Sequence, residues 1–212
     1  MQGTHDELEL LIHSEQESRN VEFKVSFAWG KRQPRADLRA KVIRTILAMA
    51  NTPDGGAIVI GKGNDGSLLG VQPPHLTTWT QDAVCEGAND HASPSVSVTV
   101  SKRTVDGKAF VVVQVAPFDA IPVACCKQLM VRDPTTQKDV CCLLKGGLYA
   151  RSLHKIESAL VASAEEMRDI LDRALESARR RWVESNLRAG LIRFPTQEPT
   201  DADRFAAELG EI

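Results

Sequence analysis

The chain has 212 residues, of which 42% are hydrophobic and 25% are charged, as in ordinary globular proteins. Its formal net charge is −2 at pH 7, so a nucleic-acid site would have to come from local clustering of basic residues. No apolar run has the length of a membrane span, and the acidic start MQGTHDELEL differs from the basic, then apolar, start of a secretion signal. We therefore expect a cytoplasmic protein without membrane contact, with its five cysteines reduced.

The first elements alternate between helix and strand patterns. A capping box at Thr4 to Glu7 predicts an amphipathic helix that reaches about Ser14 or Glu17. The segment NVEFKVSF, residues 20–27, alternates apolar and polar side chains and predicts a half-buried strand.

A second helix and a buried strand follow. The spacing of apolar residues predicts a helix over 37–50, which the turn sequence NTPDGG ends. The continuous apolar run AIVIG then predicts a central strand buried on both faces, and LLGV a short return strand. A third helix is expected over 76–87.

The remaining pattern is mostly strand, followed by one long helix. SVSVTVSKRTV and KAFVVVQVA, joined by Asp106-Gly107, predict a hairpin, and further strands are expected in QLMVR, VCCLL and GLYARS. Ser163 and Glu166 form a capping box for a helix that runs to about Gly190. The expected fold is α+β, with a mixed or antiparallel sheet flanked by helices. We divide it into a domain over 1–160, a C-terminal helix over 161–192 and an acidic tail over 193–212.

Two acids and a lysine near the first strand are the candidate chemical site. Glu17 and Glu22 would point about 140° apart on one helix, so they can converge only if the helix ends between them. Glu22 and Lys24 share one face of the predicted strand. Such a group could bind a hard divalent cation and a phosphate, but spacing alone favours the polar side of an edge strand.

Several ordered motifs resemble the Schlafen-type AlbA-like domain. They are ESRNVEFK, a helix ending AMANTPDGGAIVIGKGNDGSLLGV, and later GGLYARS with a helix opening at SAEEM. The resemblance covers about residues 7–175. It implies a compact α+β domain that binds nucleic acid, and that in some relatives cleaves transfer or ribosomal RNA with three acids and a divalent metal, Mg²⁺ or Mn²⁺.

The resemblance also implies roles for individual residues. It places the first acid at Glu17, the second at Glu22 and the accompanying lysine at Lys24, with the metal held by the two glutamates. The third acid is expected two residues after Gly61, where the chain has Gly63. Asp65 in the same turn is the remaining candidate for that role, and the missing acid weakens the case for catalysis.

Basic residues near this strand are the candidate contacts for nucleic-acid phosphates. These basic residues lie in the loop and helix that directly follow the Glu22 strand in the sequence, as a phosphate-binding rim requires. A solvated helix face explains them equally well. With Trp29 and Phe27 as candidates for base stacking, the expected nucleic-acid-binding residues are Lys24, Lys31, Arg32, Arg35, Arg39, Arg44 and Arg151.

Two further motifs carry weaker signals. Gly56 to Lys62 matches the start of a P-loop, but its interior is a predicted strand and Gly63 replaces the hydroxyl residue that holds Mg²⁺. The vicinal pairs Cys125-Cys126 and Cys141-Cys142 lack a C-x-x-C spacing, so zinc is not expected and buried thiols are the preferred interpretation.

The C-terminal helix carries more apolar surface than one small sheet would cover. Larger Schlafen proteins join two such lobes, so a homodimer through this helix could rebuild their arrangement. The preferred function is a nucleic-acid-binding domain for RNA or DNA. The alternatives are a metal-dependent endoribonuclease that acts on transfer or ribosomal RNA, and an inactive interaction module of the same fold.

Overall fold

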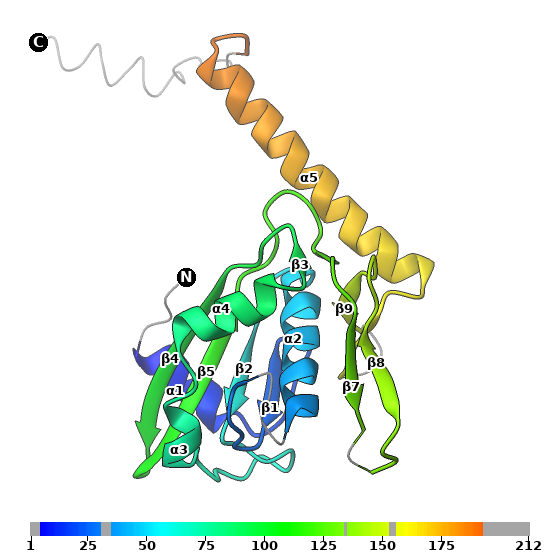
Figure 1. Ribbon diagram of the computed structural model, residues 1–212. Coiled ribbons are helices and arrows are strands. Elements are labelled where there is room, and N and C mark those ends of the chain that lie inside the picture. The colour runs from blue at the N-terminus through cyan, green and yellow to red at the C-terminus, as the bar shows by residue number, and fades with distance from the viewer. Residues whose placement is uncertain (1–4, 31–34, 134, 153–155, 193–212) are drawn as a thin grey trace, which may run out of the picture. The chain divides into compact units, whose positions relative to one another are not determined.

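A four-stranded mixed sheet forms the centre of the fold in the computed structural model, which describes residues 5–30, 35–133, 135–152 and 156–192 (Figure 1). The first two strands are parallel, and the other neighbours are antiparallel. The expected α+β class with a mixed sheet is confirmed. In spatial order the strands are β1 (Val21–Lys24), β2 (Gly56–Ile60), β5 (Lys108–Val115) and β4 (Val98–Val105).

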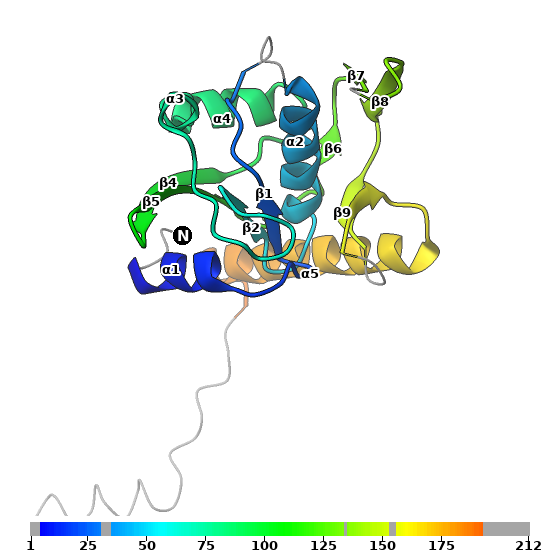
Figure 2. The same ribbon diagram turned by 90° about the horizontal axis from the view of Figure 1, so that it is seen from below.

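Helices cover both faces of this sheet. Figure 2 shows α1 on one face and α2, with α4, on the other. The third helix begins later than expected because the Thr80 hydroxyl caps it, accepting a hydrogen bond from the Ala83 backbone N–H at 3.2 Å, and a separate short turn of helix precedes it. Thr4 of the predicted first cap lies outside the described residues. The helices are α1 (His5–His13), α2 (Ala36–Ala50), α3 (Pro73–Leu76) and α4 (Gln81–Asn89).

The β4–β5 hairpin follows the sequence prediction closely. Val105 pairs with Lys108, and the two residues between them have positive φ, 51° at Asp106 and 73° at Gly107. Asp-Gly tolerates this conformation, whose twist matches that of the flanking strands. The predicted return strand LLGV forms only an isolated bridge between Lys62 and Leu68.

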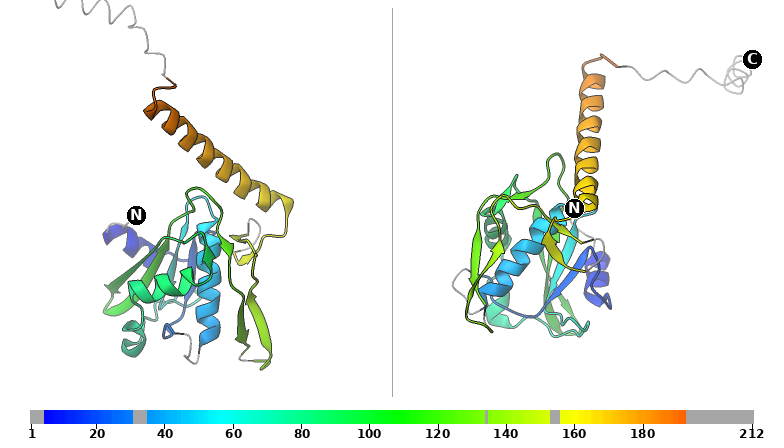
Figure 3. Two further views of the ribbon diagram at one scale, coloured as in Figure 1. Left: turned by 45° about the horizontal axis from the view of Figure 1, so that its top comes forward. Right: turned by 90° about the vertical axis from the view of Figure 1, so that its right-hand side faces the viewer.

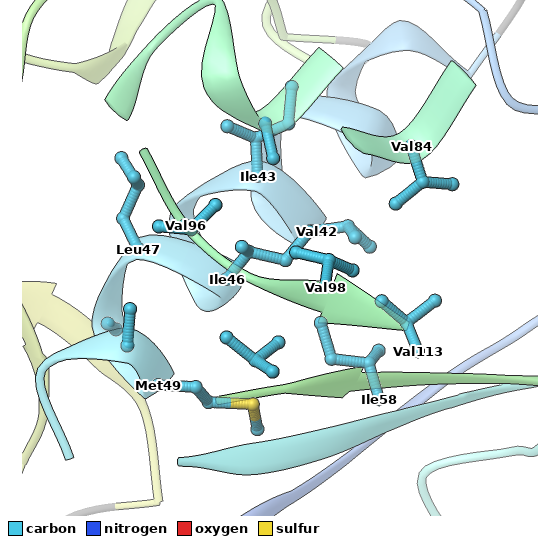
Figure 4. Packing of buried hydrophobic residues seen from close by; sticks show 14 of the residues in the cluster. Val42, Ile43, Ile46, Leu47, Met49, Ile58, Val84, Val96, Val98 and Val113 are labelled. Atoms are coloured by element: carbon cyan, nitrogen blue, oxygen red, sulfur yellow. The ribbon is translucent and has the colours of Figure 1, made fainter. Parts of the chain in front are cut away.

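The main core lies between α2 and the sheet. Side chains from α2 interdigitate with those of β2, β4 and β5, among them Ile46, Ile58 and Val113 (Figure 4). A second cluster on the other face packs Leu8 and Ile12 of α1 against β2 and β5. Alternate residues of β2 serve the two clusters, so this strand is buried on both faces as predicted.

Three two-stranded sheets complete the domain. The hairpin of β7 and β8 lies alongside α2 in two directions of view (Figures 1 and 3), and α2 contacts both strands. The β9–β10 pair contacts α2 as well. The strands are β3 (Ala92–Ser93) with β6 (Ala124–Cys125), β7 (Leu129–Arg132) with β8 (Asp139–Leu143), and β9 (Tyr149–Arg151) with β10 (Ser158–Leu160).

The long C-terminal helix α5 (Ala164–Arg188) is confirmed, with Ser163 as its cap: its hydroxyl accepts from the Glu166 N–H at 3.1 Å. Gly190 ends the helical turn with a φ of 71°. By its internal contacts the chain divides into two units, residues 1–175 and 176–212, with the boundary inside α5. The expected tail over 193–212 lies outside the described residues. No helix in the described part of the chain is long and apolar enough to cross a membrane.

Candidate nucleic-acid interface and acidic site

Glu22 and Lys24 share one face of β1, as the strand period predicts, and they form an ion pair with each other. The second oxygen of Glu22 pairs with the Arg151 guanidinium of β9. The Lys24 ammonium also donates to the Phe23 carbonyl at 2.9 Å. Both carboxylate oxygens of Glu22 are therefore already bound to cations.

Arg151 is a structural cation in this arrangement. Its side chain is fully buried, and it donates to the backbone carbonyl of Arg19 at 3.0 Å and to that of Ser18 at 2.7 Å. Ser158 accepts a further bond at 3.3 Å. The guanidinium that we expected at a nucleic-acid contact instead fixes the loop before β1, and no part of it faces solvent.

Glu17 turns back onto the first strand, where Oε1 accepts the backbone N–H of Phe23 at 2.7 Å. The backbone bridge between Ser18 and Val21 shapes the same turn. The structure thus brings Glu17 and Glu22 to neighbouring places at the start of the domain, which the turn between helix and strand requires. Each acid has a protein partner there.

Asp65 does not complete a metal site. Its Oδ1 accepts from the Ser67 hydroxyl at 2.6 Å and from the Ser67 N–H at 3.0 Å, and these two bonds lower the pKa of the Asp65 carboxyl. A Cβ placed on Gly63 would lie only 2.5 Å from Asp65 Oδ1 and from Ser67 Oγ. The Asp65–Ser67 pair therefore occupies the space into which an acid at position 63 would extend.

The acids do not fit a divalent cation as they stand. Among the described residues there is no group of three or more His, Cys, Asp or Glu side chains arranged to hold a metal. A hard cation such as Mg²⁺ needs several free oxygen ligands, and the oxygens of Glu22 are paired with Lys24 and Arg151. We derive no catalytic step through a metal at this site.

Lys62 has a structural role rather than that of a P-loop lysine. Its buried ammonium donates to the carbonyls of Ile12, at 2.7 Å, and Ser14, at the end of α1. It also lies 4.0 Å from the centroid of the Phe23 ring, and burial lowers its pKa. The preceding residues are the hydrogen-bonded strand β2, so their amides are committed to the sheet.

The predicted basic residues separate into buried and accessible groups. Arg39 is buried and stacks on Trp29, with 5.0 Å between its guanidinium carbon and the ring centroid. Arg44 is half-buried, whereas Arg35 is exposed and lies 3.4 Å from the buried Asp37 carboxylate. Lys31 and Arg32 lie outside the described residues.

Sequence reasoning missed the basic residues that the β7–β8 hairpin brings beside α2. Lys127 and Arg132 line the same pocket as Arg39, and Lys41 acts electrostatically on Asp133 at the end of β7. The residues of segments 35–44 and 127–139 include seven cations and three acids, an excess of positive charge that the chain's net charge conceals. We call the following side chains the basic surface: Arg35, Lys41, Arg44, Lys127, Arg132 and Lys138.

The aromatic residues expected to stack on bases belong to the core. Phe27 and Trp29 are buried and pack on Trp79, with ring centroids 5.1 and 4.9 Å apart. The indole N–H groups of Trp29 and Trp79 donate to backbone carbonyls at 2.9 Å. The stacking prediction is wrong for both residues, because the segment that follows β1 packs its aromatic side chains into the core instead of exposing them to solvent.

Each vicinal cysteine pair has one buried and one exposed member, as alternation along a strand requires. Cys125 and Cys142 are buried, and burial raises the pKa of both thiols. Cys126 and Cys141 are exposed, and none of the five cysteines is paired in the described part of the chain.

Comparison with known proteins identifies one family. The model described as Schlafen, AlbA_2 matches residues 17–144. A search of curated proteins finds no match. Among solved structures, the chain is similar to the DIP2311 protein from Corynebacterium diphtheriae, with a TM-score of 0.46 and 19% identity over 76% of this chain and 27% of that one. It is also similar to the N-terminal domain of a Nitrosomonas europaea protein described as related to the ATP-dependent DNA helicase RecG, with a TM-score of 0.37 and 23% identity over 56% and 76%. The chain thus spans about a quarter of the DIP2311 protein.

Proposed function

The chain belongs to the Schlafen AlbA_2 family of nucleic-acid-related domains, and from that premise we propose that it binds RNA or DNA through backbone phosphates. The observation that carries the proposal is the basic surface between α2 and the β7–β8 hairpin. Lysine and arginine side chains that gather on one surface replace the counterions of a polyanion, and this replacement supplies most of the sequence-independent affinity.

The accessible part of this surface suits phosphate contacts better than the residues near β1. Lys41 and Arg35 are both about half exposed, at 50% and 52% of the side chain. Both cations share the single carboxylate of Asp37, at 3.4 and 3.6 Å, whereas Lys24 is only 15% exposed and has Glu22 as its partner. We therefore place the nucleic acid along α2 and the hairpin rather than at the acidic site.

The experiment measures binding of labelled single-stranded RNA and duplex DNA over a range of salt concentrations. We expect the logarithm of the affinity to fall linearly with the logarithm of the salt concentration, with a slope of about −0.7 per phosphate contact for single strands. The double variant Lys41→Ala/Lys138→Ala should bind more weakly and show a shallower slope.

A matched control separates local contacts from net charge. Lys102→Ala/Lys108→Ala removes the same charge from the exposed β4–β5 hairpin. Equal losses in both double variants would show a non-specific charge effect and contradict the proposed surface. Absence of binding by the wild-type protein would leave the interaction module as the function to pursue.

The alternative function is a metal-dependent endoribonuclease at Glu17 and Glu22. The turn that brings Glu17 back onto β1, beside Glu22, favours this alternative. The pairing of Glu22 with two cations argues against it. Incubation of transfer RNA with Mg²⁺ or Mn²⁺ tests it, with Glu17→Gln as the variant because Glu22 also holds the fold together. Cleavage that disappears in this variant would replace our proposal.

We also propose a homodimer through α5. Leu171, Leu175 and Trp182 are 56%, 49% and 61% exposed, and their spacing of four and seven residues puts them on one side of the helix. Spacings of this kind allow two helices to pack against each other. Light scattering of the wild-type protein and of Trp182→Glu tests the dimer. We expect the wild-type protein to have the mass of two chains and the variant that of one; a wild-type mass of one chain would contradict the dimer.

Finally, we propose a cytoplasmic location. All five cysteines, each within the described residues, are free thiols, and two of them are exposed. Exposed free thiols persist in a reducing compartment. Fractionation of cells that produce the tagged protein tests the location.

A further inference from the structure

A pocket of about 340 Å³ lies between the start of α2, the end of α4 and strand β7. This volume belongs to the size class of small-ligand pockets. Three full cations and one acid line it, so its charge favours an anion. The charged or titratable lining residues are Arg39, Asp90, His91, Lys127 and Arg132.

Arg39 supplies a donor that the protein itself does not use. The residue is 5% exposed, and its Nε has no hydrogen-bond partner among the described residues. Burial lowers the pKa of Arg39, while the charges of Asp90 and Glu86 raise it, and a guanidinium remains protonated under these conditions. The Nε–H group is therefore a buried donor without a partner in the described part of the chain, which costs free energy, and a bound oxyanion would supply the missing acceptor.

Gly87 of α4 makes room for this arginine. A Cβ at position 87 would lie 2.6 Å from a terminal nitrogen of Arg39 and 2.9 Å from the Trp29 ring. The absence of a side chain therefore lets the guanidinium lie between the ring and the helix. Glycine is otherwise unfavourable inside a helix, so the position serves packing at the cost of helix propensity.

The rim of the pocket is held in place by hydrogen bonds. His91 is 4% exposed, and its Nδ1 lies 3.0 Å from the Lys127 carbonyl oxygen. The Cys126 N–H donates to the His91 carbonyl at 2.9 Å, and the Cys125 thiol donates to the Lys127 carbonyl at 3.2 Å. These bonds fix the segment that carries Lys127 against the end of α4, while the side chains of Lys127 and Arg132 remain exposed.

We propose that this pocket binds one phosphate group, with Arg39 at its buried end and Lys127 and Arg132 at its rim. The planar guanidinium can present two parallel N–H groups to phosphate oxygens, and the lysine adds a point charge. The inference rests on the proposed function when the phosphate belongs to a nucleic acid. A free nucleotide would offer the same chemistry, and the experiment separates the two sources.

The test compares three probes on the full chain: inorganic phosphate, adenosine monophosphate, and an RNA oligonucleotide without terminal phosphates. Two variants address the pocket. Lys127→Ala/Arg132→Ala removes the rim cations, and Gly87→Ala pushes Arg39 aside without changing the charge. We expect about tenfold weaker oligonucleotide binding in the double variant, with a salt slope lower by about 0.7 for each lost contact.

Gly87→Ala should weaken the same binding. Because its Cβ also meets the buried Trp29 ring, circular dichroism and the melting temperature are measured with it and must show a folded protein. Lys102→Ala/Lys108→Ala is the charge-matched control for the double variant. A third outcome supports the pocket with a free nucleotide as its ligand: the wild-type protein binds phosphate or the mononucleotide but not the oligonucleotide, and the pocket variants bind none of the three.

Two results would overturn the inference, and they differ in what they say of the proposed function. In the first, the wild-type protein binds the oligonucleotide, and neither pocket variant binds it more weakly than the control variant does. This result contradicts the pocket but leaves the proposed nucleic-acid binding intact. In the second, the wild-type protein binds none of the three probes. This result contradicts both the pocket and the proposed nucleic-acid binding.

Discussion

Arg151 of β9 and Glu22 of β1 form an ion pair across 129 positions of the sequence. The pair joins the last part of the domain to the edge strand of the central sheet. Because Arg151 also donates to two carbonyls of the turn before β1, the same guanidinium fixes the position of Glu17 and Glu22. The family motif at the start of the chain and the YARS motif are thus two halves of one structural contact.

Arg151→Met should destabilise the protein by about 3 kcal/mol, since it removes one of the two cations that pair with the largely buried Glu22 and the donor to the Ser18 and Arg19 carbonyls. Urea unfolding followed by circular dichroism measures the loss. Arg180→Ala is the control: it breaks an exposed pair with Glu176 at 4.0 Å, and such pairs contribute about 0 to 1 kcal/mol. A loss below 1 kcal/mol for Arg151→Met would contradict the structural role.

Asn51 should be as sensitive as a core residue, although it is polar. Its side chain makes three hydrogen bonds of 2.8 Å, two with the backbone of Val123 and one with the carbonyl of Tyr149. Asn51→Ala leaves these buried groups without partners, for an expected loss of about 3 kcal/mol or more.

Asn186→Ala is the matched control for this prediction. Its amide donates to the Trp182 carbonyl at 2.7 Å in an exposed place, where substitutions usually change stability by less than about 0.5 kcal/mol. Similar unfolding midpoints for the two variants would show that the Asn51 bonds do not hold the domain together.

The sequence predicted elements whose signals are local. Alternating side chains marked β1 and β4, the Asp-Gly turn marked the β4–β5 hairpin, and Ser163 marked the start of α5. Each signal lies within a few residues, so one chain segment is enough to read it. The two-residue strands β3 and β6 carry no such pattern, and each depends on a pairing partner more than thirty positions away in the sequence.

The candidate site was harder to predict because burial decides what a charged residue does. Arg39 and Arg151 look like surface cations in the sequence, yet both are buried. Arg151 pairs with the carboxylate of Glu22, and Arg39 stacks on the Trp29 ring. Lys127 lies 88 positions after Arg39 in the sequence, and tertiary contacts of its segment with His91 at the end of α4 bring it to the same pocket.

Lys62→Met tests whether the buried ammonium holds α1 in place. The variant leaves the carbonyls of Ile12 and Ser14 without their donor, and hydrogen bonds to charged groups contribute about 1.5 to 3 kcal/mol. We expect a lower unfolding free energy and faster hydrogen exchange in α1. Lys108→Met is the control, because Lys108 donates to the Leu68 carbonyl at 2.6 Å from an exposed position. Equal protection of α1 in both variants would refute the role of Lys62.

The buried thiols should make stability fall at alkaline pH. Burial raises the pKa of Cys125 and Cys142 above the ordinary value of about 8.5, so the unfolded chain loses these protons before the folded one does. The stabilisation is complete below the unfolded pKa and is lost as the pH rises through the folded pKa. Each thiol contributes a slope of up to about 1.4 kcal/mol per pH unit in that window.

Urea unfolding at several pH values above neutrality measures this slope in Cys125→Ala and Cys126→Ala. We expect a shallower decline in the first variant than in the second, because burial is the largest cause of the raised Cys125 pKa and the neighbouring Cys126 is a smaller one. The comparison is internal to one vicinal pair, so general effects of alkaline pH on lysines and tyrosines cancel. A slope that is the same in both variants would mean that the Cys125 thiol ionises alike in the folded and unfolded chain.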